Sequence, residues 1–385
     1  MSPPERQRRW RLVLGEPGGQ GLGEGSEPVG QDRTVDRALA ELYDADPRRR
    51  GAGLGSSAPE VARWLGDIRT YFPTSVVQVV QRDAVERLGL HRLLLEPELL
   101  QAVEPDVHLV GTLLSLRDVM PQEVRATARQ VVRTVVQEVE RRIAQRTRTA
   151  VAGALDRSNR TRRPRPRDID LGRTIAANLA HYLPEHRTVV PERLVGHARR
   201  QRSVARDVVL LVDQSGSMAE SVVYAGVFGA VLASLSTLRT SMVVFDTAVV
   251  DLTEELSDPV DVLFGTQLGG GTDINRALAY GQSLVTRPAD TTLVLISDLY
   301  EGGVREEMLR RTGSLVRSGV QVVVLLALSD SGAPAHDAEN AAALAELGVP
   351  AFACTPDAFP DLLAVALERG DVAAWAEREL GRRTT

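Results

Sequence analysis

The chain contains no lysine. All 46 basic residues among its 385 are arginine. A Walker A phosphate loop requires a lysine, and an enzyme that forms a Schiff base with its substrate requires a lysine amine. Both classes are excluded, so the protein is not itself a P-loop ATPase.

Cysteine and aromatic residues are also scarce. The single cysteine, Cys354, has no second thiol in the chain with which to form a disulfide. This is typical of a reducing compartment, so we expect a cytoplasmic protein in which Cys354 is a small core residue. Aromatic residues make up 4% of the chain, so the cores should consist mainly of Leu, Val and Ala. We see neither a signal sequence nor an apolar run near the roughly 20 residues of a membrane span.

Charge is divided unevenly along the chain. Residues 1–206 carry 35 arginines against 26 acidic residues, whereas residues 207–385 carry 11 arginines against 25 acidic residues. A basic half beside an acidic half indicates either pairing within the chain or the recruitment of separate partners.

Residues 1–200 are predicted to form an all-α domain. Helices are expected at 1–14, 34–43, 59–68, 73–88, 97–103, 106–117, 121–152 and 168–183, followed by an extended segment at 188–195 that leads into the sheet. The helix over 121–152 has an apolar stripe at i, i+3/i+4 spacing, which is typical of a bundle helix with a solvated basic face. A nucleic-acid surface is the alternative for its arginines, but no interleaved aromatic residues support it.

Two segments of this half have unusual composition. Residues 15–30 are rich in glycine but contain no G-x-G-x-x-G and follow no clear strand, so we interpret them as a loop, with a nucleotide site as the minor alternative. Residues 157–167 hold six arginines, two prolines and nothing apolar. They are predicted to be an exposed linker, with docking on an acidic partner such as nucleic acid as the alternative.

From residue 207 the pattern changes to alternating strands and helices. Strands are expected at 208–212, 241–245, 248–252, 292–297, 320–327 and 350–354. Helices are expected at 219–238, 258–265, 274–286, 303–318, 337–347 and 357–368. The alternation predicts an α/β domain over residues 203–370 with a doubly wound, mostly parallel sheet, followed by a tail helix within 371–385.

Three loops of this domain carry oxygen-bearing side chains just after a strand or before a helix. The stretch DVVLLVDQSGS places Asp213, Ser215 and Ser217 after a buried strand, with Gly216 expected to allow a tight turn. The stretches LGGGTD and TTLVLISD supply Thr272 and Asp298. Parallel sheets form their sites at the carboxyl ends of strands, so we expect these side chains to converge. Hard oxygen ligands suit Mg²⁺, Mn²⁺ or Ca²⁺.

These five residues resemble the metal-ion-dependent adhesion site (MIDAS) of von Willebrand factor A (VWA) domains. That site has the order Asp-x-Ser-x-Ser, Thr, Asp, and all five positions match. The resemblance implies a Rossmann-like VWA sheet with an antiparallel edge strand, and a six-coordinate cation, most simply Mg²⁺. Ser215 and Ser217 are the best candidates for direct ligands, and the other three bind directly or through water. In the family an open coordination position is often taken by an Asp or Glu of another protein.

The order of segments is similar to that of bacterial CoxE-like VWA proteins, most closely those of the YehP type. The segments that carry this likeness are RRWRLVLG, LVDQSGSM, LGGGTD and SDLYEGG. Such proteins are typically encoded with a MoxR-type AAA+ ATPase. The resemblance therefore implies a non-enzymatic adaptor or co-chaperone that binds such an ATPase or its client, while nucleic acid is not expected as a partner. The absence of lysine agrees, because the partner would have to bind ATP.

A metal-dependent hydrolase acting alone is the alternative function, since Mg²⁺ can activate water. We nevertheless expect no catalytic residue. Asp213 stands where a G-x-S-x-G nucleophile elbow needs a glycine, and no histidine lies near the motif.

Several residues beside the motif have simpler interpretations. Asp273 is expected to cap the following helix, and Asp246 and Thr247 to form a turn. Tyr300 and Glu301 are either ordinary exposed loop residues or determinants of partner specificity.

Overall fold

The computed structural model describes residues 33, 68–69, 72–88, 94, 100, 103–158, 160–161, 169–197, 206–330 and 335–383. It divides into two compact units, Met1–Val135 and Val136–Thr385. The division lies inside the long helix α7 (Gln122–Ser158), and the predicted domain limits at residues 200, 203 and 370 stay predictions. The helices expected over 1–14, 34–43, 59–68 and 97–103, and the glycine-rich stretch 15–30, lie outside the described residues, apart from residues 68, 100 and 103.

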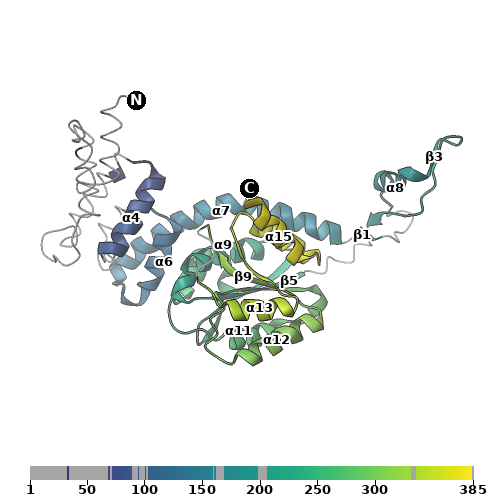
Figure 1. The fold of residues 1–385 in the computed structure, drawn as a ribbon. Coiled ribbons are helices and arrows are strands. Elements are labelled where there is room, and N and C mark those ends of the chain that lie inside the picture. Colours follow the sequence, from purple (N-terminus) through teal and green to yellow (C-terminus); the bar gives the residue numbers. More distant parts are fainter. Residues whose placement is uncertain are drawn as a thin grey trace, which may run out of the picture. The chain divides into compact units, whose positions relative to one another are not determined.

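Helices make up the described part of the first unit. These are α4 (Thr74–Leu88), α6 (Val107–Ser115), the short 3-10 helix η2 (Arg117–Val119) and the beginning of α7 (Figure 1). The Asp106 carboxylate caps α6 by accepting a hydrogen bond from the Leu109 N–H at 2.6 Å. The positions of α4 and α6 agree with the helices predicted at 73–88 and 106–117.

Helix α7 extends six residues beyond its predicted end at residue 152. The apolar stripe continues through Val151 and Ala154, which are buried, and no proline stops the helix before Ser158, while Gly153 is accommodated within it. Most of the predicted linker 157–167 lies outside the described residues. Within it, β1 (Arg160–Thr161) pairs antiparallel with β4 (Gly196–His197).

The prediction of a single helix over 168–183 is wrong for the second half of that range. Helix α8 (Leu171–Ala177) ends at Asn178, and after a 3-10 turn (Leu179–His181) the chain forms an antiparallel hairpin of β2 (Tyr182–Leu183) and β3 (Thr188–Val189). The buried Asn178 amide donates to the Thr174 carbonyl and accepts from the backbone of the returning chain. These contacts end the helix, and they also show that 188–195 packs back on it instead of leading into the sheet.

The second unit contains a six-stranded sheet in the order β10-β9-β8-β5-β6-β7. Its strands are β5 (Arg206–Asp213), β6 (Leu238–Phe245), β7 (Val249–Asp251), β8 (Thr291–Ile296), β9 (Gln321–Leu328) and β10 (Ala351–Cys354). All neighbours are parallel except β6 and β7, which form the predicted hairpin at one edge. The predicted doubly wound α/β fold is confirmed.

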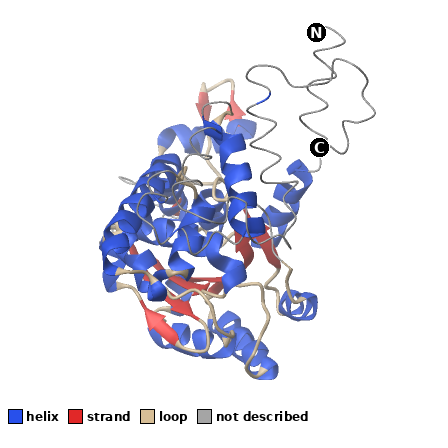
Figure 2. Ribbon diagram, turned by 90° about the vertical axis from the view of Figure 1, so that its left-hand side faces the viewer, coloured by secondary structure: helices blue, strands red, loops and turns tan. Residues whose placement is uncertain are grey.

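Helices cover both faces of this sheet (Figures 1 and 2). On one face, α11 (Ile274–Leu284), α12 (Arg305–Ser318) and α13 (Ala338–Glu346) contribute to a buried cluster with side chains of β5, β6, β8 and β9. On the other face lies α9 (Ala219–Ala233), where a Cβ added to Gly229 would be 3.0 Å from the Met242 sulfur. The small residues of α9 therefore permit the close approach to the sheet that the sequence predicts.

Two further helices pack beside α9, and a third closes the chain. These are α10 (Pro259–Gly265), α14 (Phe359–Leu367) and the tail helix α15 (Val372–Arg383). The Phe228 and Phe359 rings of α9 and α14 lie 4.6 Å apart between centroids, and Trp375 of α15 packs on Phe352 at 6.1 Å. Cys354 is buried, as expected. The tail helix is thus docked on the sheet domain.

Helix α9 is shorter than the predicted helix over 219–238. It ends at Ala233, where the Ser234 hydroxyl bonds to the Val231 carbonyl, and β6 begins at Leu238. Residues 216–233 are long and apolar enough to span a membrane, but 67% of this segment is buried inside the protein. A buried helix in a protein core has the same length and composition.

Candidate metal centre

The candidate centre begins where β5 ends. Asp213 is fully buried, and its carboxylate accepts one hydrogen bond on each oxygen: from the Ser215 N–H at 2.9 Å and from the Ser297 hydroxyl at 2.8 Å. A carboxylate oxygen has two lone pairs, so each oxygen keeps one for another partner. The neighbouring strand β8 therefore fixes the orientation of the first predicted ligand.

The second carboxylate, Asp298, follows β8 and is also buried. The Ser217 hydroxyl donates to Asp298 Oδ2 at 2.7 Å, and the Ser215 and Ser217 hydroxyl oxygens lie 3.3 Å apart. Four of the five predicted residues, Asp213, Ser215, Ser217 and Asp298, are thus connected at the carboxyl ends of two adjacent parallel strands.

The fifth residue, Thr272, is placed through its backbone. Its carbonyl accepts the Gly302 N–H at 2.7 Å, which ties the glycine-rich loop to the loop after β8. Gly269 and Gly270 have φ values of 123° and 102°, in the region that favours glycine. Thr272 is buried on this neighbouring loop, and no hydrogen bond joins its hydroxyl to the other four residues in the described part of the chain.

The tight turn predicted at Gly216 is present. Gly216 begins a 3-10 helix (Gly216–Met218), and its φ is not positive. A Cβ added there would meet nothing within 4 Å. The local turn therefore does not depend on glycine at this position.

The two buried carboxylates repel one another. Burial raises the pKa of Asp213 above its usual value of 3.8, the hydrogen bonds from Ser215 and Ser297 oppose this, and the charge of Asp298 adds to the increase. A cation between these groups would remove the repulsion, because it is attracted to both.

The residues present fit a hard divalent cation. The predicted donor atoms are all carboxylate or hydroxyl oxygens, which Mg²⁺, Mn²⁺ and Ca²⁺ prefer, and no sulfur or imidazole takes part. Within the described ranges, no three His, Cys, Asp or Glu side chains gather into a group that would hold a metal. A cation here would therefore need hydroxyl ligands in addition to the two carboxylates.

Two residues hold the loops of the candidate centre in place and were not predicted from the sequence. Ser297 binds Asp213 through its hydroxyl, and the same oxygen accepts the Leu299 N–H at 3.1 Å. The Gln214 side chain accepts the Gln267 N–H and its carbonyl accepts the Gly269 N–H, both at 3.0 Å. Both residues adjoin a predicted ligand in the sequence, which is the one signal that would have pointed to them.

The flanking residues behave largely as predicted. Asp273 caps α11 by accepting the Arg276 N–H at 2.8 Å. Asp246 makes the expected turn by accepting the Ala248 N–H at 2.6 Å. Glu301 does more than an ordinary loop residue, because it accepts the Ile274 N–H at 2.7 Å and so joins the loop after β8 to the start of α11.

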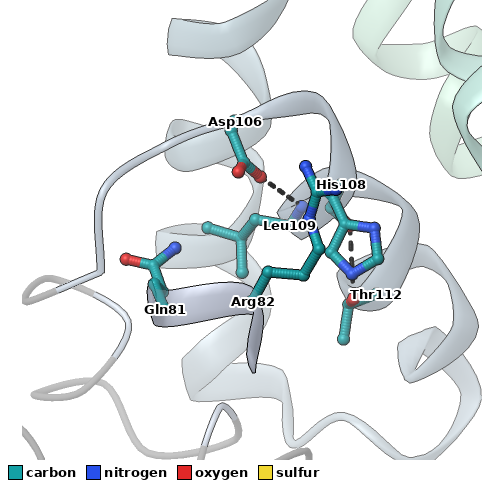
Figure 3. Close-up of a pocket in the computed structure, with 6 residues that line it drawn as sticks. All are labelled: Gln81, Arg82, Asp106, His108, Leu109 and Thr112. Atoms are coloured by element: carbon teal, nitrogen blue, oxygen red, sulfur yellow. Dashed lines mark hydrogen bonds between the residues drawn. The ribbon is translucent and has the colours of Figure 1, made fainter. Parts of the chain in front are cut away.

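A separate small cavity lies in the first unit (Figure 3). Its lining consists of Gln81, Arg82, Asp106, His108, Leu109 and Thr112. Its volume is about 10 Å³, which is at the lower limit for one water molecule. It is too small for a ligand, so the metal centre is the stronger functional candidate.

Comparison with known proteins places the chain in a family. The family model for "VWA domain containing CoxE-like protein" matches residues 141–363. The chain belongs to this family. A relative, the uncharacterized protein YehP of Escherichia coli (strain K12), is 38% identical over 370 residues, which cover 94% of this chain and 96% of the relative. The resemblance seen in the sequence is therefore confirmed.

Solved structures show more distant likenesses. An aerotolerance-related membrane protein from Bacteroides fragilis has 16% identity and a TM-score of 0.33, over 43% of this chain and 99% of that one. BatB from Bacteroides thetaiotaomicron has 17% identity and a TM-score of 0.33, over 44% of this chain and 99% of that one. The fold assignment rests on the strand order and the family match.

Proposed function

We propose that this CoxE-like VWA protein is a divalent-metal-dependent adaptor that binds another protein and has no catalytic activity of its own. The observation that carries the proposal is the connected group of Asp213, Ser215, Ser217 and Asp298. Together with Thr272 these residues offer hard oxygen atoms around two buried carboxylates, which supports Mg²⁺ as the cofactor, with Mn²⁺ and Ca²⁺ as alternatives.

The residues of the centre have different roles in this proposal. Ser215 and Ser217 are more exposed than the two aspartates, so their hydroxyls are the groups that would hold the cation toward solvent. Asp213 and Asp298 would supply negative charge from beneath, and Asp298 orients the Ser217 oxygen. When bound, the cation would offer an open coordination position to a carboxylate oxygen of the partner protein.

The partner we propose is a MoxR-type AAA+ ATPase or the client of such an ATPase, in the cytoplasm. Family membership supports this, because CoxE-like proteins are typically encoded beside such ATPases. The chain has no lysine with which to build a Walker A loop of its own, so ATP hydrolysis would belong to the partner. The chain would then act as an adaptor or co-chaperone.

The proposal is tested by purifying the tagged full chain from its native cell in Mg²⁺ or in EDTA, with mass spectrometry of the captured proteins. The decisive variant is Asp213→Asn. Its matched control is Asp207→Asn, because Asp207 is a buried aspartate at the other end of β5, paired with Arg287 at 2.8 Å. We expect capture of an AAA+ ATPase or its client in Mg²⁺ by the wild type and by Asp207→Asn, and loss of capture in EDTA and in Asp213→Asn.

The same preparations distinguish the alternative function. Capture that is unchanged in EDTA would contradict a metal-dependent adaptor. Turnover of phosphoester or peptide substrates by the purified wild type, lost in Asp213→Asn, would instead favour a metal-dependent hydrolase.

A further inference from the structure

The loop over residues 299–304 exposes two large apolar side chains. Tyr300 is 50% exposed and Val304 is 52% exposed. In the described chain from residue 206 onward, the other exposed large apolar side chains are Val250 on β7, at 39%, and Tyr280 on α11, at 36%. Two exposed large apolar side chains on one short loop make it a candidate interaction site.

The backbone of this loop is held at three points. The Leu299 carbonyl accepts the Asn340 amide at 3.0 Å, and Leu299 itself is buried with φ 67°. The Glu301 carboxylate accepts the N–H groups of Ile274 and Gly303. The Gly302 N–H donates to the Thr272 carbonyl on the neighbouring loop. Tyr300 lies between these points, so it is presented on a fixed backbone, and binding would cost little ordering of the loop.

The loop also adjoins the metal centre. It begins at the residue after Asp298, and the Gly302 N–H lies 2.7 Å from the Thr272 carbonyl oxygen. The loop that carries Thr272 consists of glycine over residues 269–271, which have no side chains to contribute. Tyr300 and Val304 are therefore the exposed large apolar side chains on the two loops that this hydrogen bond joins.

Among the described residues on the loops around the centre, acidic groups outnumber basic ones, which include Arg276, bonded to the Thr247 carbonyl, and Arg305, bonded to Asn340. Besides the two predicted aspartate ligands, three half-buried aspartates lie on the loops of the centre: Asp246, Asp273 and Asp337. The Asp273 N–H donates to the Asp246 carbonyl, and the Asp337 N–H donates to the Asp298 carbonyl, both at 2.9 Å. A partner segment with several neighbouring carboxylates would be repelled by these groups. A segment with one carboxylate for the metal would meet less repulsion.

We propose that residues 299–304 form a specificity surface beside the metal centre, and that the partner segment it fits has a single Asp or Glu flanked by large apolar side chains. The carboxylate would bind at the open metal position while an apolar neighbour packs on Tyr300 and Val304. This inference rests on the proposed function, because it concerns the partner of the same centre.

A peptide array tests the inference on the full-length protein. Each immobilised peptide carries one central Asp or Glu, with Leu and Phe, Ser, or further Asp and Glu at the flanking positions. In Mg²⁺ we expect the apolar-flanked peptides to bind about tenfold more tightly than the Ser-flanked ones, and the acid-flanked ones to bind most weakly. Tyr300→Ser and Val304→Ser should reduce the apolar preference to less than about threefold.

Matched controls are available in the same unit. Tyr280→Ser and Val250→Ser remove the same residue types from exposed positions outside the loop, and both should keep the wild-type preference. Calorimetric titration with Mn²⁺ should give the same affinity for all four variants as for the wild type. This measurement separates loss of the specificity surface from damage to the metal centre.

The possible failures are distinguishable. If the wild type binds acidic peptides only in Mg²⁺ but shows no apolar preference, or if the preference survives in both loop variants, the inference is wrong and the adaptor proposal stands. If the wild type binds no acidic peptide in a Mg²⁺-dependent way, the proposed function fails, and the inference fails with it.

Discussion

Arg142 and Asp330 form a bidentate ion pair: Arg142 Nη1 and Nη2 donate to the two Asp330 oxygens at 3.0 and 3.1 Å. The same guanidinium also donates to both oxygens of Asp357, at 2.9 and 2.7 Å. Asp330 follows β9 and Asp357 follows β10, so one arginine of α7 joins two loops at the carboxyl edge of the sheet. The family match begins at residue 141, which agrees with this end of α7 belonging with the sheet domain.

Removing this arginine should destabilise the second unit. Arg142→Met breaks two bidentate pairs, but the side chains are about half exposed, so we expect a loss of about 1 kcal/mol in the free energy of unfolding. Urea denaturation measures it. Arg141→Met, one residue earlier on the exposed surface of α7, is the control and should change stability by less than about 0.5 kcal/mol. Equal stability of both variants would show that the pairs contribute nothing.

The same contact predicts a pH dependence. Hydrogen bonds from Arg142 hold the pKa of Asp357 below its usual value of 3.8. Because the pKa is lower in the folded state, the pair stabilises the protein above pH 3.8, and this contribution is lost as the pH falls toward the folded-state pKa. We therefore expect the stability difference between wild type and Arg142→Met to be constant from pH 7 to about 5 and to shrink below about 4. Urea titrations at these pH values check it, and a difference that grows on acidification would contradict the assignment.

The sheet was predictable because its strands are short apolar runs that end in polar residues. The run Val208 to Val212 is an example, and the observed strand differs from it by two residues or fewer at either end. The end of α9 was not predictable, because the Ser and Thr residues that follow Ala233 do not prevent a helix from continuing in the way that a proline does. Similarly, the α8 helix ends because the buried Asn178 binds the returning chain, a contact between residues 14 and 15 apart in sequence.

For the candidate centre, residue types and order were sufficient to name five residues that the structure places on neighbouring loops. What the sequence could not provide is the support behind them. Ser297 contacts Asp213 across 84 positions, and this depends on the pairing of β5 with β8. Nor could the sequence show that a Cβ has open space at Gly216 but none at Gly302, which faces the Thr272 backbone.

Metal binding should stabilise the protein through the two buried carboxylates. At a Mg²⁺ concentration ten times the dissociation constant, mass action gives about 1.4 kcal/mol, or an increase in Tm of roughly 3–6 °C for a unit of this size. Differential scanning calorimetry in Mg²⁺ and in EDTA measures the shift. We expect Asp213→Asn to lose it and Asp207→Asn to keep it. A shift that persists in Asp213→Asn would place the bound ion elsewhere.

A methyl group added at Gly302 should weaken metal binding through Thr272. The new Cβ would lie 2.7 Å from the Thr272 carbonyl oxygen, closer than real Cβ atoms approach, and backbone atoms must move to relieve the contact. Gly302→Ala should therefore displace the loop that carries Thr272, with a loss of about 1–3 kcal/mol in stability and a several-fold weaker Mg²⁺ affinity by calorimetric titration. Gly216→Ala is the control, because it lies within the Asp-x-Ser-x-Ser motif but has open space for a Cβ. It should leave both quantities near wild type, and a weaker Mg²⁺ affinity in Gly216→Ala than in Gly302→Ala would contradict the geometry described for the two loops.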